Sequence, residues 1–267
     1  MIKAYNFVLN PEKGTFLIVQ IKILHTNYIY LNKKDMYRLK LSSAATKEEL
    51  ETVYGRTFQF PSIYKPELVI EGKEESILPI IQSENSQAIT FGIWGLLPND
   101  FEGNWEDFQR IFSTLLMDVK KKEYNKLSSV FNKPSRCLIM VTGFFIHRYV
   151  KGELYPYYIY QEDNKPFCLG GICTTLNDGF ATFSIFTTFS HGKVKEIQNL
   201  CSKMPLIIAP EDYEQWLQPD LLISDPEHLF SKKRTFTLKS HPIAKEFFNN
   251  NIYYDSILEP VNYKELD

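Results

Sequence analysis

The sequence has few cysteines and no pattern that would link them. Its 267 residues include four, Cys137, Cys168, Cys173 and Cys201, and none of them forms a C-x-x-C pair. A chain of this length can bury a sufficient core without disulfides. We therefore expect four reduced thiols and a cytoplasmic protein.

The sequence also lacks the short motifs that define the large enzyme classes. It has no G-x-x-x-x-G-K-[ST] phosphate loop, no G-x-G-x-x-G turn, no H-E-x-x-H pair and no G-x-S-x-G elbow. Its five histidines are scattered along the chain, whereas a zinc site needs at least three converging ligands. We expect no metal site and no cofactor.

No apolar run is long enough for a membrane span, which needs about 20 mostly apolar residues. The stretch Phe16–Leu31 is interrupted by polar residues between Gln20 and Asn27, so it fits neither a span nor a signal peptide. We expect residues 1–35 to be an N-terminal extension folded as a β-hairpin, and the main domain to start at Met36. No membrane role is expected.

Neither sign of charge is in excess. Thirty basic and 32 acidic side chains give a net charge of −2, which excludes a globally basic nucleic-acid binder but allows a local basic groove. Aromatic residues make up 15% of the chain, and such residues suit the half-buried surface of a sheet. The composition predicts one α+β domain rich in strands.

The order of patterns predicts mainly antiparallel strands with flanking helices. Thr46 and Glu49 form a capping box for a short helix that ends at Gly55. Apolar residues at helical spacing predict further helices over residues 105–122 and 193–201. Runs of β-forming residues predict the strands, at residues 67–71, 77–82, 88–97, 137–149, 154–161, 166–174, 179–189 and 204–208.

Six sequence blocks occur in a distinctive order. They read W-G-L-L-P, R-C-L-I, G-F-F, Y-P-Y-Y-I, F-S-I-F-T-T and M-P-L-I-I, at Trp94–Pro98, Arg136–Ile139, Gly143–Phe145, Tyr155–Ile159, Phe183–Thr188 and Met204–Ile208. The series resembles the SRAP family, the SOS response-associated peptidases. The resemblance runs from Met36 to about Asn250 and leaves residues 251–267 as a C-terminal tail. It implies an SRAP-like α+β fold, a mainly antiparallel sheet or barrel-like core in a single domain.

The resemblance implies a specific chemistry. Members of the family resemble sensors of abasic sites in single-stranded DNA, to which they attach covalently. A cysteine directly after the initiator Met supplies an amine and a thiol to the sugar aldehyde. An Asn in an N-A-R-x-E block, the Glu of G-F-Y-E-W and a His shortly before R-M-P orient the aldehyde and move protons.

The positions that match these functional residues are all substituted. The family cysteine corresponds to Tyr37, and the Glu of G-F-Y-E-W corresponds to Ile146. A gapless count back from Cys137 places the Asn on Met117 and the Glu of N-A-R-x-E on Lys121. Thiol, amide and carboxylates are therefore missing.

The Arg and the His of these family motifs are also substituted in this sequence. The Arg of N-A-R-x-E corresponds to Val119, and the His falls on Gln198 or, with a shorter spacing, on Cys201. We therefore predict a catalytically inactive SRAP paralogue that is at most a non-covalent binder of single-stranded or damaged DNA.

The residues predicted to contact DNA are cationic or aromatic: Arg38, Trp94, Lys120, His147 and Arg148. Trp94 equally fits a core position, and His147 a partly exposed strand position. Two alternatives stay open. One is a protein-interaction or structural paralogue; the other is an active crosslinking enzyme in which Lys121 replaces the nucleophile by forming a Schiff base. We expect a monomer.

Overall fold

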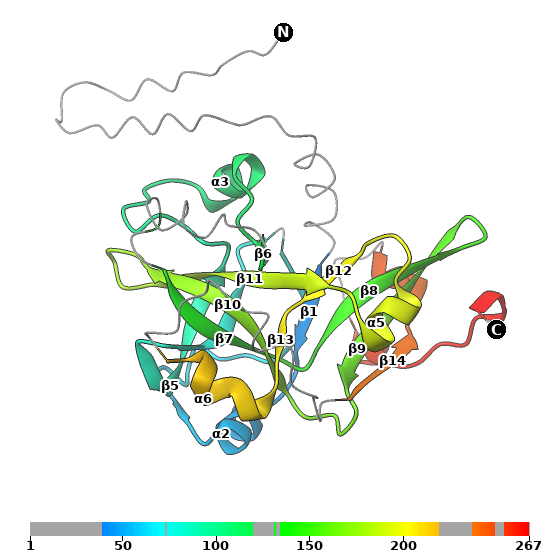
Figure 1. Cartoon of the computed structure of the whole chain (residues 1–267), viewed down its shortest axis with the longest axis horizontal. Coiled ribbons are helices and arrows are strands. Elements are labelled where there is room, and N and C mark those ends of the chain that lie inside the picture. The colour runs from blue at the N-terminus through cyan, green and yellow to red at the C-terminus, as the bar shows by residue number, and fades with distance from the viewer. Residues whose placement is uncertain are drawn as a thin grey trace, which may run out of the picture.

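A computed structural model of the chain describes residues 39–72, 74–119, 131, 134–218, 237–248 and 254–266. The predicted hairpin of residues 1–35, together with Tyr37, Arg38, Lys120 and Lys121, lies outside the described residues. The described residues form two β-sheets with a few short helices at their margins (Figure 1). The expected strand-rich α+β fold is confirmed.

The smaller sheet has five strands in the order β14-β9-β8-β1-β3, and every pair of neighbours is antiparallel. The strands β8 and β9 form a long hairpin that projects from one end of the molecule (Figure 1). Its turn residues have positive φ, 49° at Lys151 and 90° at Gly152, as a tight hairpin requires. The strand bounds are β1 (Lys40–Ser43), β3 (Glu67–Glu71), β8 (Gly143–Val150), β9 (Glu153–Gln161) and β14 (Leu238–Pro242).

The larger sheet has nine strands, with a main order of β12-β11-β10-β7-β4-β5-β2, while β13 pairs with β10 and β6 pairs with β11. It curls until β5 meets β11, but this parallel contact joins only Gly92–Trp94 to Ala181–Phe183. The sheet is therefore not a true barrel. Its strands are β2 (Thr57–Phe58), β4 (Ile77–Gln82), β5 (Asn85–Trp94), β6 (Leu116–Asp118), β7 (Ser135–Val141), β10 (Phe167–Thr175), β11 (Ala181–Phe189), β12 (Lys203–Pro205) and β13 (Ile207–Ile208).

Apolar side chains form three clusters, one between the two sheets and one on the outer face of each sheet. The central cluster joins the two sheets, with Leu41, Phe144 and Ile146 from the smaller and Ile139 and Phe183 from the larger. A second cluster lies on the other face of the larger sheet, under α2 and α6. A third lies on the outer face of the smaller sheet. The sheets are therefore buried on both faces.

The helices are short. As predicted, α2 (Lys47–Tyr54) starts at Thr46, whose hydroxyl accepts a hydrogen bond from the Glu49 amide at 3.2 Å, and ends at Gly55 in the left-handed region. No helix among the described residues has the length and apolar content to cross a membrane. The other helical segments are α3 (Trp105–Ile111), α5 (Gly192–Ile197), α6 (Tyr213–Trp216) and 3-10 turns at Pro210–Asp212, Lys245–Phe248, Asp255–Leu258 and Lys264–Leu266.

The helix predicted over residues 105–122 is wrong between Phe112 and Val119, and its last three residues lie outside the described residues. The Gln109 carboxamide oxygen accepts a hydrogen bond from the Thr114 amide at 2.8 Å, and the Thr114 hydroxyl donates to the Leu96 carbonyl at 2.6 Å. These bonds turn the chain out of the helix and align β6 beside β11. Pairing with a distant strand overrides the local periodicity.

The single strand predicted over residues 137–149 is two strands in different sheets. The chain leaves β7 in the larger sheet and enters β8 in the smaller one at Gly143. A Cβ atom on Gly143 would lie 2.3 Å from Tyr158 Cε2 and 2.5 Å from the Ile159 carbonyl oxygen. Only glycine allows this close passage, and continuous apolar patterning on both sides conceals the break.

Two further predicted elements are shorter than expected. The helix predicted over residues 193–201 ends at Ile197, where the chain turns out into the loop that leads to β12. The strand predicted over residues 204–208 is divided into β12, which pairs with β11, and β13, which pairs with β10. Leu206 joins the two: its amide donates to the Phe186 carbonyl on β11 at 2.7 Å, and its carbonyl accepts from the Gly170 amide on β10 at 2.8 Å.

The described part of the C-terminal tail packs on the domain. Ile257 is buried in the outer cluster with Phe145 and Phe247. The Tyr263 hydroxyl donates to the Ile243 carbonyl at 2.9 Å, and Lys245 pairs with Glu153 and lies over the Tyr155 ring at 4.1 Å. We call Glu153, Tyr155, Lys245 and Tyr263 the tail clasp.

Candidate functional site

The W-G-L block lies at the centre of the fold. The Trp94 indole is fully buried and donates to the Leu115 carbonyl at 3.0 Å, while the Trp105 indole donates to the Trp94 carbonyl at 3.1 Å. We call Trp94, Gly95 and Trp105 the tryptophan hub. A ring with no exposed surface cannot stack on a base, so Trp94 is a core residue and leaves the predicted DNA-contacting set.

Strand β8 places the three predicted site residues Ile146, His147 and Arg148 on alternating faces of the sheet. Ile146 is 3% exposed and belongs to the central cluster. His147 points to the opposite face, where its ring stacks on Phe248 at 5.0 Å between centroids. Arg148 returns to the Ile146 face near Tyr157, whose pKa is raised by burial and lowered in part by the Arg148 charge. Of the two predicted DNA-contacting residues on β8, Arg148 alone shares a face with Ile146.

Strand β6 places Met117 away from Ile146. Met117 lies opposite Phe186 on β11, and both side chains are in the second cluster, under the larger sheet. Leu116 lies opposite Ile185 and packs on the central cluster that contains Ile146. The structure therefore does not bring Met117 and Ile146 together. Asp118, two residues from Leu116, shares the Leu116 face.

A polar cluster lies where β6, β11 and β12 meet. Asp118 Oδ2 is 2.8 Å from Lys203 Nζ, and this ammonium lies 3.7 Å above the centroid of the Phe189 ring. Cα pairing places Phe189 directly opposite Lys203 and Thr187 opposite Asp118, so the three side chains share one face of the sheet. Phe189 is 50% exposed. We call Asp118, Phe189 and Lys203 the β11 edge site.

Gln198 closes the loop beside this site. Its amide nitrogen lies 2.7 Å from the Cys201 carbonyl oxygen and 2.8 Å from that of Lys203. The neighbouring Asn199 side chain accepts from the Tyr149 amide at 2.9 Å and donates to the Tyr149 carbonyl at 2.7 Å, which ties the loop to β8. An amide engaged in this way positions the backbone and does not transfer protons at neutral pH.

The four thiols are not placed for nucleophilic chemistry. Cys137, Cys168 and Cys173 are fully buried, and burial raises the pKa of the Cys168 thiol to about 12. Burial also raises the pKa of Cys137 well above its usual range. Cys201 is partly exposed and accepts a hydrogen bond from the Lys203 amide at 3.4 Å. Within the described ranges, no three His, Cys, Asp or Glu side chains converge on a possible metal position.

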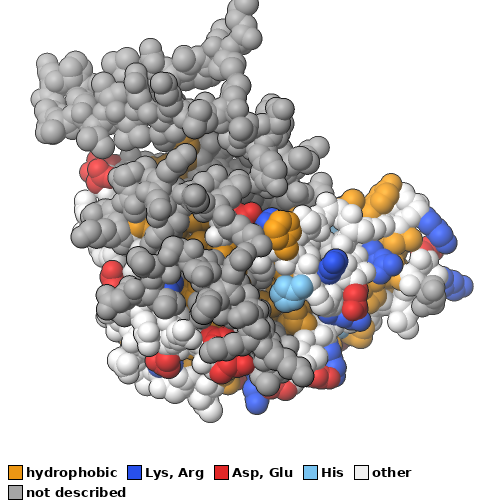
Figure 2. Space-filling model, viewed as in Figure 1, with side chains coloured by type: hydrophobic (Ala, Val, Ile, Leu, Met, Phe, Trp, Pro, Cys, Tyr) orange, Lys and Arg blue, Asp and Glu red, His pale blue; other side chains and the backbone are white. Residues whose placement is uncertain are grey.

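Further cations lie on the two elements next to the Gln198 loop, α5 and β8. Helix α5, which precedes the Gln198 loop, carries the exposed Lys193 and Lys195. Arg148 lies on β8, and Lys151 lies in the turn that follows this strand. Lys and Arg side chains gather over the part of the molecule that carries α5 and the β8–β9 hairpin (Figure 2). This distribution gives the near-neutral chain a locally basic face.

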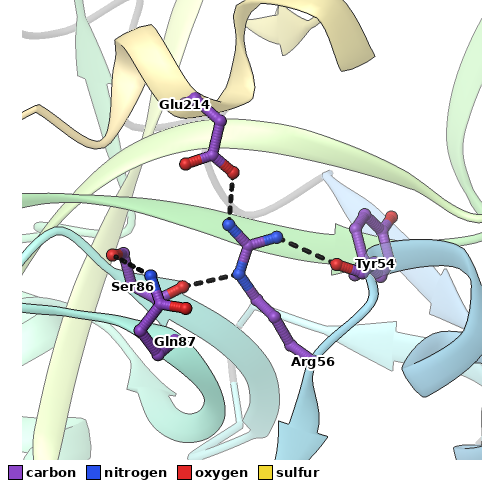
Figure 3. A network of polar contacts seen from close by, with 5 residues as sticks. All are labelled: Tyr54, Arg56, Ser86, Gln87 and Glu214. Atoms are coloured by element: carbon purple, nitrogen blue, oxygen red, sulfur yellow. Dashed lines mark hydrogen bonds and ion pairs between the residues drawn. The ribbon is translucent and has the colours of Figure 1, made fainter.

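A second polar network is centred on Arg56 and has a structural role. The Arg56 guanidinium donates to the Tyr54 carbonyl at 2.9 Å and the Ser86 carbonyl at 2.5 Å, and pairs with Glu214 at 2.5 Å (Figure 3). These bonds join the end of α2 to the start of β5 and to α6. Since the guanidinium bonds backbone carbonyls, this network fixes the helices that cover the second cluster.

Sequence reasoning missed the members of the β11 edge site, although signals were present. Lys203 directly precedes Met204-Pro205, where the family has the Arg of R-M-P. Asp118 lies inside the stretch matched to N-A-R-x-E, and Phe189 follows the T-T of the T-F-x-I-L-T-T block. The pairing of β6 and β12 with opposite ends of the same segment of β11 was not visible in the sequence.

Comparisons with known proteins agree with this fold. A structure of a protein from Bacteroides thetaiotaomicron superposes with a TM-score of 0.67 at 26% identity, covering 84% of this chain and 99% of that one. Two structures from Bordetella bronchiseptica, one of them a phage-related protein, share the fold at 12% and 15% identity, with TM-scores of 0.59 and 0.54. They cover 77% of this chain and 99% and 94% of theirs.

A sequence relative and a family model complete the comparison. The chain is 26% identical over 151 residues to an abasic site processing protein of Saccharomyces cerevisiae; the match covers 54% of this chain but only 39% of that protein. The family model for SOS response associated peptidase (SRAP) matches residues 37–250. The chain therefore belongs to the SRAP family.

Proposed function

We propose that this protein is a catalytically inactive SRAP-family member that binds single-stranded DNA without forming a covalent bond to it. The observation that carries the proposal is Ile146. It stands where the family has the Glu of G-F-Y-E-W, and it is an apolar side chain 3% exposed in the central cluster. An aliphatic group at that place cannot move a proton.

The side chains on both faces of β6 support the same conclusion. The Asn and Arg of N-A-R are two residues apart, so on a strand they share a face. The gapless register places them on Met117 and Val119, whereas the face directed at the central cluster carries Leu116 and Asp118. Neither pair supplies an amide or a guanidinium.

Non-covalent binding needs cations for phosphates and exposed rings for bases, and the chain keeps both. Lys203 supplies positive charge beside a half-exposed Phe189, and Arg148 on β8 and Lys195 on α5 are further cations. The yeast relative is described as an abasic site processing protein, which makes single strands that carry an abasic site the first ligand to test.

The test is incubation of the full chain with a single-stranded oligonucleotide that carries one abasic site, with and without borohydride, followed by a denaturing gel. We expect no adduct under either condition, together with salt-sensitive binding in a native assay. A heat-stable adduct would contradict the proposal that the protein forms no covalent bond to DNA. A borohydride-dependent adduct lost in Lys121→Met and kept in Lys151→Met would instead establish Lys121 as a replacement nucleophile. Affinity no higher than for a neutral polymer would overturn the binding.

A further inference from the structure

The ammonium of Lys203 is held between a carboxylate and an aromatic ring. It lies 2.8 Å from Asp118 Oδ2 and 3.7 Å from the Phe189 ring centroid. The side chains of Lys203 and Asp118 are only 22% and 17% exposed. Solvent and salt screen such a pair less than a fully exposed one, so the pairing is more than a surface encounter.

The backbone around the three side chains is fixed. Asp118 is held in register with Thr187 on β11, and the Val119 amide donates to the Thr187 carbonyl at 3.1 Å. Lys203 is paired with Phe189 on the other side of β11, and its carbonyl accepts from Gln198 at 2.8 Å. Strands β6 and β12 and the Gln198 loop thus hold the Asp118 carboxylate and the Lys203 ammonium next to each other.

The side chains of the β11 edge site can bind the two parts of one nucleotide in a single strand, its phosphate and its base. A lysine ammonium binds a phosphate oxygen, and a half-exposed ring offers surface for a base. The Asp118 carboxylate places anionic oxygens on the same ammonium, as a phosphate would.

We propose that Phe189 and Lys203 form a nucleotide subsite for single-stranded DNA and that Asp118 occupies its phosphate position from within the chain. The proposal rests on the proposed function. It adds where on the protein the single strand binds and which residue limits the affinity. A bound phosphate displaces the Asp118 carboxylate from Lys203, and the displaced carboxylate then lies beside the incoming negative charge. Asp118 therefore weakens binding.

The experiment measures fluorescence anisotropy of the full chain with a labelled single strand of about 15 nucleotides, over a range of salt concentrations. Asp118→Asn keeps the shape and removes the charge. We expect it to bind about three- to tenfold more tightly, with a steeper salt dependence by about 0.7 in log–log slope. Glu196→Gln is the matched control, since Glu196 pairs with Lys193 on α5 and its loss changes net charge equally. We expect less than about a twofold effect for the control.

Two more variants identify the subsite. In the Asp118→Asn background, Lys203→Met and Phe189→Leu should each abolish the gain, with thermal unfolding as the check on folding. Equal affinities for wild type and Asp118→Asn, or equal gains for Asp118→Asn and Glu196→Gln, would overturn the subsite while leaving the proposed function intact. Absence of binding by both wild type and Asp118→Asn would overturn both. Binding by Asp118→Asn where wild type shows none would support the subsite alone.

Discussion

The tryptophan hub and the β11 edge site both contact β11, yet they differ in kind. In the hub, Trp94 and Trp105 are buried, and both indole N–H groups donate hydrogen bonds to backbone carbonyls. At the edge site, Phe189 is half exposed and the polar groups pair with one another. The hub contains Trp94 and Gly95 of the W-G-L block that the chain shares with its family. It stabilises the fold through buried packing, whereas the edge site combines an ion pair with a half-exposed ring.

The largest effect should come from the hub, through Gly95→Ala. Gly95 has a φ of +118°, and an added Cβ would lie 2.6 Å from Gln109 Nε2 and 2.7 Å from Trp105 Nε1. Strain and overpacking together should lower the free energy of unfolding by about 3 kcal/mol, measured by urea denaturation. Gly152→Ala is the control, because its φ is +90° with no atom within 4 Å. It should cost about 1 kcal/mol; an equal loss would show that the close packing around Gly95 is unimportant.

A smaller effect is expected for Trp105→Phe. The substitution removes the indole donor and leaves the buried Trp94 carbonyl without that hydrogen bond. We expect a loss of about 2 kcal/mol in thermal unfolding. Phe112→Leu serves as control, since Phe112 is at the end of the same helix and 42% exposed. If both variants unfold at the wild-type temperature, α3 does not stabilise the hub.

At the edge, Gln198→Ala should cost less than either hub variant. It removes the hydrogen bonds that close the loop before β12, and a partly exposed amide of this kind contributes about 1 kcal/mol. Urea denaturation measures the loss, and Lys195→Ala, exposed on the adjacent α5, should be near neutral. A loss as large as that of Trp105→Phe would remove the distinction between hub and edge.

The smallest effect concerns the tail clasp and depends on pH. The hydrogen bond from Lys245 lowers the pKa of the Glu153 carboxyl, and the same bond raises the pKa of Lys245. The Glu153 contribution is therefore present above its unfolded pKa and lost as the pH falls through the lowered value; the Lys245 contribution is lost as the pH rises through its raised value.

The melting temperature of wild type against Glu153→Gln tests this. The difference should be steady near neutral pH and vanish in acid, below the ordinary carboxyl range of about 4. Glu162→Gln, which removes one carboxylate charge from the pair with Lys239, is the control for the change in net charge. A difference between wild type and Glu153→Gln that persists at acid pH would show that the pair does not act through charge.

Sequence patterns predicted those elements whose causes are local. The helix at residues 47–54 follows from Thr46, Glu49 and Gly55, all within a few residues of one another. The strands at residues 67–71 and 77–82 have the predicted bounds, because turn residues flank them. The helix predicted through Lys122 failed because Leu116–Asp118 gains more from pairing with β11, about 70 residues away in sequence, than from local helical bonds.

The sequence by itself determined the family and the strand-rich fold class, because these depend on residue types and their order. The tertiary structure decided which side chains meet. Trp94 became a core residue, His147 turned away from Ile146, and Met117 was separated from it, since alternation on paired strands assigns each side chain to one face. The β11 edge site exists only because β6 and β12 pair with the same strand, and no local pattern encodes that pairing.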